Sequence, residues 1–356
     1  MAANNKDQLA SAPTVIEPGL IFFRDIVGQD RVLALLQGAR RQGRLAHAYL
    51  FLGPEGVGRA TVARALAAAL NCHRPREDGD ACGDCPSCRR LAAGTHPDFL
   101  VISPEEGKSQ IGIERIREFR RLTAYPPLDG GWRVALIKPA EALTVQNDAA
   151  ANALLKTLEE PPDRHLLILT AGVEADLLPT VVSRCQKLSF VPLPLSLVAQ
   201  EIARRRGLTP PQAQLLAALS RGSLGRALAL DPEELERQRA QVLSDLETLA
   251  GGSAGQMLDW AARLNKSKAE LENFLLLARL WYRDLLLSWF QAPAAMLAHQ
   301  DLVSRLEEEK LTGSPEAWFA RLSALSAAGR HLKANLNPEL TLNILGLQLR
   351  QTRAGL

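Results

Sequence analysis

The chain contains 356 residues, a length that predicts two or three domains rather than one small module. Hydrophobic residues make up 47% of the sequence and charged residues 23%, which excludes a wholly disordered or fibrous chain. Because 42 basic and 39 acidic residues leave a formal charge of +3, any contact with nucleic acid has to come from a local cluster of cations. No apolar run reaches the roughly 18 residues that a membrane span needs, and no secretory signal is recognisable after Met1. We therefore expect no membrane partner and a cytoplasmic location.

Between about residue 26 and residue 193, short apolar runs alternate with longer helical patterns. This alternation predicts an α/β domain built on a parallel sheet. Pro192 and Pro194 then interrupt the chain, and the remaining sequence has helical periodicity and is rich in Leu, Ala and Arg. The predicted fold class is therefore α/β followed by all-α. The expected strands are Ala48–Leu52, Phe99–Ser103, Arg133–Ile137 and Leu166–Thr170.

The interruptions in these patterns predict the domain boundaries. We expect a polar tail over residues 1–20 and the α/β domain over residues 21–193. A Gly-Gly-Ser cluster at residues 251–253 divides the helical part into two domains, residues 194–250 and residues 251–356.

A glycine-rich loop follows the first predicted strand and precedes an alanine-rich helix, which is the order of a phosphate-binding P-loop. The loop glycines are Gly53, Gly56 and Gly58. The positions that normally hold a phosphate-binding Lys and a magnesium-binding Ser or Thr are occupied by Arg59 and Ala60. Thr61 comes one residue late and points about 100° around the helix from the magnesium position. Nucleotide held without hydrolysis and a loop that only turns the chain both remain open.

The end of the third predicted strand gives a second, independent indication. A P-loop ATPase carries acidic residues there to hold magnesium and activate water. This chain has Lys138 and Pro139, and the nearest carboxylate, Glu141, lies beyond both. A competent ATPase site is therefore not expected.

Four of the five cysteines lie within seventeen residues, in a segment rich in Gly, Pro, Asp and Arg. Two CxxC steps preceded by a further cysteine fit a tetrahedral, structural zinc site with four thiolate ligands. Free or redox-active thiols and an iron–sulfur cluster are the alternatives. The predicted ligands are Cys72, Cys82, Cys85 and Cys88, in an insertion over residues 72–88.

Several segments occur in an order that is similar to a known family. They are Phe23–Gln29, the altered P-loop, the four-cysteine insertion, Asn152–Pro162 and Ser183–Cys185. Together they resemble the bacterial DNA polymerase III clamp-loader subunits of the AAA+ class, with specific matches over residues 22 to about 195. The two altered ATPase elements make the chain similar to the delta prime class rather than to the gamma/tau class, which hydrolyses ATP.

The resemblance implies a role in a pentameric machine that opens a ring-shaped sliding clamp and places it on primed DNA. It makes residues 194–250 a helical lid and residues 251–356 a collar for oligomerisation. The implied partners are gamma/tau and delta subunits, primed DNA within the complex and, indirectly, the sliding clamp. The chain would be part of the DNA polymerase III holoenzyme, with no expected catalysis of its own. The alternative function is a gamma/tau-type subunit that binds and hydrolyses ATP itself.

The resemblance also assigns roles to single residues. Arg184, with Ser183 beside it, would project toward ATP bound by a neighbouring subunit, as a trans arginine finger. A planar guanidinium suits this role because it can bind phosphate oxygens and stabilise developing charge. Thr170 would match the polar first sensor at the end of the fourth strand. In the lid, Gly225 stands where relatives carry an ATP-sensing arginine, and Arg226 comes one residue later.

A further candidate for DNA contact is the segment 113–121, whose pattern predicts a helix with four arginines. Arg117 and Arg121 are four residues apart and would present cations on one side to a phosphate backbone. Glu114 and Glu118 could instead pair with arginines on an ordinary solvated face. A zinc-dependent nucleic-acid-binding module that works without partners is a third hypothesis for the whole chain.

Overall fold

The computed structural model of the chain describes residues 19–145 and 148–351, so residues 1–18 of the predicted tail lie outside the described residues. The chain divides into two compact units between Pro192 and Leu193. Among the described residues, no helix combines the length and apolar character needed to cross a bilayer.

The described part of the first unit contains a five-stranded, fully parallel sheet with the strand order β2-β3-β4-β1-β5. The prediction of a parallel sheet is confirmed, and four of the strands lie where the apolar runs placed them. The fifth, β5, was not predicted, because three of its four side chains are exposed and it contains no apolar run. The strands are β1 Ala48–Leu52, β2 Phe99–Ile102, β3 Arg133–Ile137, β4 His165–Ala171 and β5 Gln186–Ser189.

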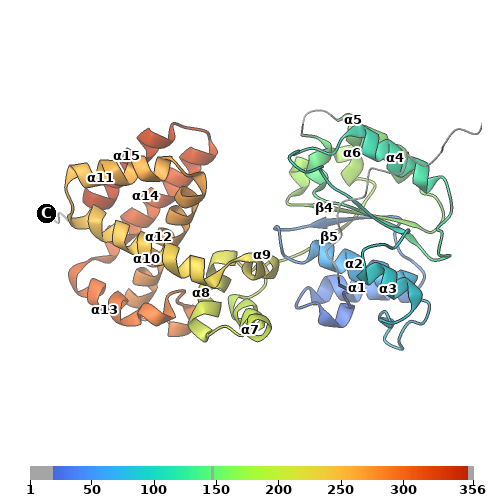
Figure 1. Cartoon of the computed structure of the whole chain (residues 1–356), viewed down its shortest axis with the longest axis horizontal. Coiled ribbons are helices and arrows are strands. Elements are labelled where there is room, and N and C mark those ends of the chain that lie inside the picture. The colour runs from blue at the N-terminus through green and yellow to red at the C-terminus, as the bar shows by residue number, and fades with distance from the viewer. Residues whose placement is uncertain (1–18, 146–147, 352–356) are drawn as a thin grey trace, which may run out of the picture. The chain divides into compact units, whose positions relative to one another are not determined.

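Helices cover both faces of this sheet, and Figure 1 shows α1, α2 and α3 on one side and α4, α5 and α6 on the other. The first layer contains η1 Phe23–Asp25, α1 Asp30–Arg41, α2 Arg59–Asn71 and α3 Pro86–Ala92. The second contains α4 Ile113–Thr123, η2 Ala140–Leu143, α5 Ala149–Glu159, η3 Glu174–Asp176 and α6 Pro179–Val182.

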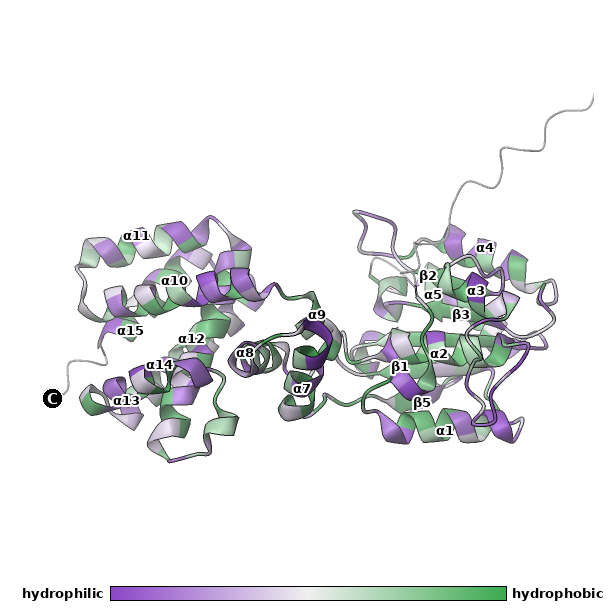
Figure 2. Ribbon diagram, turned by 60° about the horizontal axis from the view of Figure 1, so that its bottom comes forward, coloured by the Kyte–Doolittle hydropathy of each residue, from purple (hydrophilic) through white to green (hydrophobic). Residues whose placement is uncertain are grey.

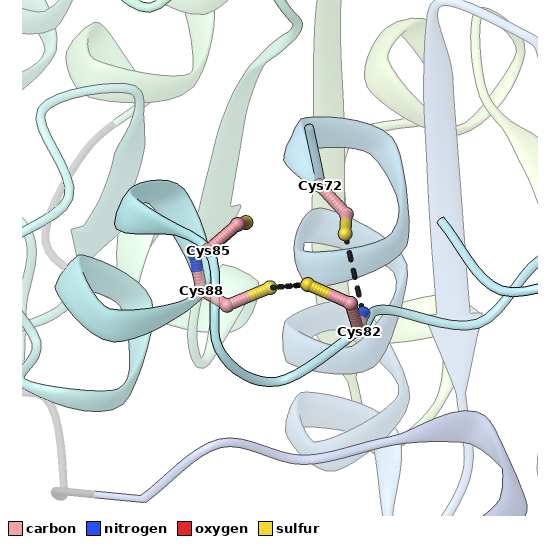
Figure 3. A group of neighbouring side chains, drawn as sticks. All are labelled: Cys72, Cys82, Cys85 and Cys88. Carbon is pink, nitrogen blue, oxygen red and sulfur yellow. Dashed lines mark hydrogen bonds between the residues drawn. The ribbon is translucent and has the colours of Figure 1, made fainter. Parts of the chain in front are cut away.

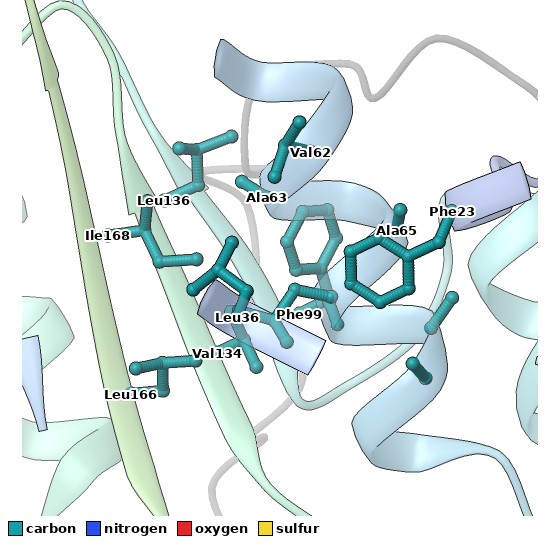
Figure 4. Close-up of a cluster of buried hydrophobic side chains, with 14 of the residues drawn as sticks. Phe23, Leu36, Val62, Ala63, Ala65, Phe99, Val134, Leu136, Leu166 and Ile168 are labelled. Atoms are coloured by element: carbon teal, nitrogen blue, oxygen red, sulfur yellow. The ribbon is translucent and has the colours of Figure 1, made fainter. Parts of the chain in front are cut away.

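Helix α2 is the central element of the first layer. Its small side chains, including Ala63 and Ala65, are fully buried and let the helix lie close to the sheet. Val62 packs toward Leu136 of β3 and Ile168 of β4, as Figure 4 shows. The hydropathy colouring of Figure 2 agrees, because α2 and the strands are mostly hydrophobic whereas α1 is mixed. The start of α2 is thus fixed at the carboxyl end of β1.

The second unit is helical in its described part. Helices α10, α11 and α12 pack with one another, α14 packs against α12, and α15 packs against α10, α11 and α14, whereas α7, α8 and α9 pack together. The further division into a lid, 194–250, and a collar, 251–356, stays a prediction. The helices are α7 Leu195–Arg206, α8 Pro210–Ser220, α9 Leu224–Ala229, α10 Pro232–Gly251, α11 Ala254–Asn265, α12 Lys268–Trp289, η4 Ala294–Met296, η5 Gln300–Leu302, α13 Val303–Thr312, α14 Pro315–Lys333 and α15 Pro338–Gln351.

A buried ion pair joins the beginnings of β2 and β3. Asp98 is fully buried and accepts hydrogen bonds from Nε and Nη2 of Arg133, at 3.1 and 2.9 Å. Arg133 also donates to backbone carbonyl groups of the segment after α4, including that of Tyr125 at 2.9 Å. The backbone N–H groups of Leu128 and Asp129 donate to the Asp98 carboxylate at 3.0 and 2.8 Å. One ion pair therefore holds two strand starts and the loop between α4 and β3.

We predict that Asp98→Asn destabilises the first unit by about 3–5 kcal/mol, because it leaves the buried Arg133 guanidinium without a counter-charge. The measurement is hydrogen exchange in increasing urea, which gives the midpoint at which β2 and β3 lose protection. Glu105→Gln is the control, since it removes a carboxylate from an exposed pair with Lys108 and should leave this midpoint unchanged. An unchanged midpoint in Asp98→Asn would contradict the assigned role.

Candidate functional site

The glycine-rich loop lies at the carboxyl edge of the sheet, between β1 and α2. Gly53, Gly56 and Gly58 all have positive φ, at 145°, 73° and 107°, so the loop uses backbone that other residues rarely adopt. At Gly53 a side chain is also excluded by space, because a Cβ atom would lie 2.5 Å from the carbonyl oxygen of Phe190. Gly58 directly precedes the first residue of α2, whose N-terminal N–H groups favour an anion.

Arg59 begins α2 and is half-buried, and its Nη1 has no hydrogen-bond partner among the described residues. Burial lowers the pKa of this guanidinium, whereas the carboxylates of Glu141 and Glu55 act in the opposite direction. Glu141 accepts a hydrogen bond from the N–H of Gly172 through Oε1, and its Oε2 is buried without a partner in the described chain. The loop therefore contains a charged group that can meet an anion, but in a different shape from lysine.

The two positions at which a P-loop ATPase carries its magnesium ligands lack suitable oxygens. Ala60 has no side-chain oxygen, and Thr61 comes one residue further along α2. Lys138 follows β3 directly and is exposed, so a cation stands where a magnesium-binding carboxylate would be needed. Thr170 lies near the end of β4 and is buried, and its hydroxyl is 3.5 Å from the carbonyl oxygen of Ile137. The carboxyl ends of these neighbouring parallel strands share one edge, where a P-loop protein binds nucleotide.

Four cysteines form a compact cluster, shown in Figure 3. Cys72 follows the end of α2, Cys82 lies in the next loop, and Cys85 and Cys88 lie at the start of α3. Their Sγ atoms all lie within 4.8 Å of one another, and none of the five cysteines, each in the described part of the chain, forms a disulfide. The Sγ atoms of Cys82 and Cys88 are 3.9 Å apart.

These sulfur positions fit a single metal ion. A tetrahedron with metal–sulfur bonds of about 2.3 Å places its sulfurs about 3.8 Å apart. Backbone N–H groups approach the sulfurs, from Cys82 to Cys72 at 3.2 Å and from Cys88 to Cys85 at 3.5 Å. Burial opposes ionisation of Cys85, but the N–H groups of Cys88 and His73 lower the pKa of its thiol to about 6. Burial raises the pKa of the Cys88 thiol, and the neighbouring Cys85 and Cys72 raise it further.

The cysteine segment is tied to the sheet through Asp129, in the loop that the Asp98–Arg133 pair organises. The Asp129 carboxylate contacts Arg90 Nη2 at 2.6 Å and His73 Nε2 at 3.1 Å. These contacts lower its pKa against the effect of burial. A second contact to the same loop comes from Asn71, the last residue of α2. Its side-chain oxygen accepts a hydrogen bond from the N–H of Trp132 at 2.9 Å. The cluster therefore lies at the end of α2 opposite the P-loop.

Arg184 lies just after α6 on the other side of the sheet, and its side chain is 36% exposed. Its Nη2 is 2.7 Å from Oε1 of Glu159, the last residue of α5. Its Nη1 donates to the carbonyl oxygen of Thr180 at 2.9 Å and approaches the hydroxyl oxygen of Ser183 at 3.4 Å. All these contacts are with α5, α6 and the residue after α6, which lie on the same face of the sheet. Part of the guanidinium remains exposed to solvent.

Arg117 and Arg121 both lie on the exposed side of α4, one turn apart. Arg117 pairs with Glu114, as expected for a solvated helix face. The Arg121 side chain is exposed and has no hydrogen-bond or ion-pair partner among the described residues. Of the two, Arg121 is therefore the more available to a phosphate group.

Comparison with known proteins identifies the family. A family model described as "DNA polymerase III, delta subunit" matches residues 28–194. The DNA polymerase III subunit delta' of Pseudomonas aeruginosa is 41% identical over 227 residues, which cover 63% of this chain and 67% of that protein. The subunit delta' of Bacillus subtilis is 30% identical over 328 residues, which cover 91% of this chain and 96% of that protein. The chain belongs to the DNA polymerase III subunit delta' family.

The likeness to the delta' family is longer than the likeness to tau. The DNA polymerase III subunit tau of Bacillus subtilis is 36% identical over 169 residues, which cover 47% of this chain and 29% of that protein. The match to the delta' protein of the same organism extends over nearly the whole length of both chains.

Within this delta' family chain, the structure brings the loop glycines, Arg59 and Thr61 to one edge of the sheet and gathers the four cysteines in one cluster. It places Arg184, Arg117 and Arg121 on elements that pack on the opposite face from α2. Glu159 was not predicted to have a functional role and belongs to the segment Asn152–Pro162. The contact with Arg184 joins residues 25 positions apart, so no local spacing could indicate it.

We predict that the four cysteines bind one Co²⁺ ion, used as a spectroscopic probe, and that Cys88→Ser weakens this binding and reduces the sulfur-to-cobalt charge-transfer absorption. The loss of one thiolate of four is the physical cause. Cys185→Ser is the control, because Cys185 is buried in another part of the unit and should leave the spectrum unchanged. A wild-type spectrum in Cys88→Ser would contradict the assigned ligand set.

Proposed function

We propose that the chain is a non-hydrolysing delta' subunit of the bacterial replicative clamp loader. In this role it supports a pentamer and supplies Arg184 in trans to ATP bound by a neighbouring gamma/tau subunit. The complex then places the sliding clamp on primed DNA. The delta' family membership and the altered P-loop support this function together.

The observation that carries the proposal is the carboxyl edge of the sheet. Lys138 and Pro139 follow β3 where an ATPase needs carboxylates, and Ala60 replaces a magnesium ligand. This edge can still meet an anion through Arg59 and the N-terminus of α2, so binding of nucleotide without hydrolysis remains compatible with it. Hydrolysis by this chain is not expected, because Lys138 and Ala60 occupy the two positions where a P-loop ATPase carries its magnesium ligands.

The cysteine cluster is proposed as a structural zinc site. Zinc is favoured because four thiolates in tetrahedral spacing match its preferred ligands and leave no open coordination position. Bound zinc would hold the loop after α2 to the start of α3, a segment with few apolar side chains of its own. The site's position at the far end of α2 from the P-loop supports a structural role.

The proposed partners are the gamma/tau and delta subunits, with primed DNA inside the complex, the sliding clamp contacted indirectly, and a cytoplasmic location. The collar, residues 251–356, is proposed to mediate assembly and the lid, residues 194–250, to connect it to the α/β unit. The gamma/tau-type alternative, a chain that hydrolyses ATP itself, is supported by the matches to tau and gamma/tau subunits and conflicts with the altered carboxyl edge.

In a complex reconstituted with gamma-type and delta subunits, we predict that Arg184→Ala strongly reduces hydrolysis at the ATP site that this subunit faces. An arginine finger contributes about 10³-fold or more to the rate, so hydrolysis at that site should become almost undetectable. Arg184→Lys should fail as well, because an ammonium group lacks the planar fork. The measurement is the amplitude and rate of phosphate release in a single turnover.

Arg237→Ala is the matched control, since it removes an exposed arginine in the helical unit. Assembly of each complex is checked by size-exclusion chromatography. A wild-type rate of ATP hydrolysis in an assembled Arg184→Ala complex would contradict the arginine-finger role. Steady hydrolysis by the isolated chain, abolished by Gly58→Val, would instead support the gamma/tau alternative.

Contact with DNA is proposed for Arg117 and Arg121 on α4. The argument rests on exposure and charge, because Arg121 has no acidic partner within the described chain and a phosphate backbone attracts such a cation. Arg117 would have to exchange its contact with Glu114 for a phosphate.

We predict that Arg121→Ala weakens binding of the assembled complex to primed DNA and lowers the slope of log affinity against log salt by about 1, as expected for one lost phosphate contact. Fluorescence anisotropy at several salt concentrations measures both quantities. Arg237→Ala serves again as the control with the same charge change. An unchanged slope in Arg121→Ala would place this arginine outside the DNA path.

A further inference from the structure

A carboxylate on α5 contacts the proposed finger. Oε1 of Glu159 is 2.7 Å from Nη2 of Arg184, and the two side chains are 48% and 36% exposed. Glu159 is the last residue of α5, and Arg184 is the second residue after α6. The pair therefore connects two separate helices at the surface of the first unit.

The backbone on both sides of this contact is well anchored. Leu154 and Leu158 of α5 and Val181 and Val182 of α6 are buried in the same core cluster. Helix α5 ends at Glu159, and the N–H of Glu160 donates to the carbonyl oxygen of Lys156. The ion pair thus joins two side chains whose backbone segments are both anchored in the core.

The guanidinium keeps donors for a second acceptor while this contact is made. Arginine has five N–H groups, and its contacts on this chain are with Thr180, Ser183 and Glu159. The first two accept hydrogen bonds from Nη1, and Glu159 forms an ion pair with Nη2. Nε has no hydrogen-bond partner among the described residues, so Nε–H and one Nη2–H remain for an incoming phosphate.

We propose that Glu159 is a positioning residue for Arg184: it holds the guanidinium in one orientation, so that the free N–H groups are presented to nucleotide on the neighbouring subunit. This inference rests on the proposed function of Arg184. An arginine side chain has many rotamers, and its ordering before the neighbour arrives removes part of the entropy loss on docking.

The strength of the contact agrees with positioning rather than with permanent sequestration. An exposed ion pair is weak, so Glu159 cannot keep the guanidinium away from a phosphate group that carries more negative charge. The same weakness limits the expected effect of removing Glu159, which should be much smaller than the effect of removing Arg184 itself.

The test uses the reconstituted complex with wild-type chain, Glu159→Ala, Glu159→Gln and Arg184→Ala. We expect Glu159→Ala to lower the rate of hydrolysis at the facing site about two- to fivefold, with the KM for ATP unchanged. Glu159→Gln keeps an acceptor oxygen and should retain most of the rate. Glu160→Ala is the matched control, because it removes the adjacent exposed carboxylate, which has no partner among the described residues.

The outcomes separate the two proposals. If Arg184→Ala lowers the rate but Glu159→Ala does not, the positioning role is overturned and the finger role stands. If Arg184→Ala has no effect, both fail. Equal losses in Glu159→Ala, Glu159→Gln and Glu160→Ala would indicate a general charge effect and would also overturn positioning. The double variant Glu159→Ala/Arg184→Ala should match Arg184→Ala alone, since Glu159 acts only through Arg184.

A second measurement uses the free chain and does not depend on any partner. The Nε–Hε NMR signal of Arg184, assigned by its absence in Arg184→Ala, should report restricted motion in the wild-type chain. This restriction should be lost in Glu159→Ala and retained in Glu159→Gln. Equal mobility in the wild type and Glu159→Ala would overturn the inference.

Discussion

The Asp98–Arg133 ion pair is the contact on which the arrangement of the first unit most depends. Both side chains are nearly inaccessible, so each charge relies on the other and on backbone groups for compensation. The Asp98 carboxylate receives backbone N–H groups, and the Arg133 guanidinium is surrounded by carbonyl oxygens of the same loop. This loop also carries Asp129, which holds the cysteine segment. The loops at the amino edge of the sheet are therefore held in place mainly by ion pairs and hydrogen bonds to charged groups.

The two ends of α2 consequently have separate tasks. Its beginning forms the P-loop at the carboxyl edge, and its end leads into Cys72 at the amino edge. The buried, alanine-rich helix connects these ends rigidly, which keeps the cysteine cluster away from any bound nucleotide. The surface around Arg184 lies on the opposite helical layer, so in the proposed complex a subunit can lose its own ATPase chemistry without disturbing the residue that it offers to a neighbour.

Much of this organisation could be predicted from the sequence, because it rests on local patterns. Apolar runs located four strands, and cysteine spacing located a cluster that the structure brings within 4.8 Å. Strand β5 was missed because Leu188 is its only buried side chain. The pairs Asp98–Arg133 and Glu159–Arg184 were missed because charged residues far apart in the chain carry no sign of their partner. The roles of Arg184, Arg59 and Arg121 stay predictions, since they concern molecules outside this chain.

The contact beneath Gly53 has a consequence for sequence surveys. A side chain at this position would collide with the backbone after β5 whether or not nucleotide is bound. Selection on folding alone is then sufficient to retain this glycine, even in a chain that does not hydrolyse ATP. A count of P-loop glycines across a genome therefore measures how many chains share an architecture, and it overstates the number of working ATPases unless the residues after the last glycine are read as well.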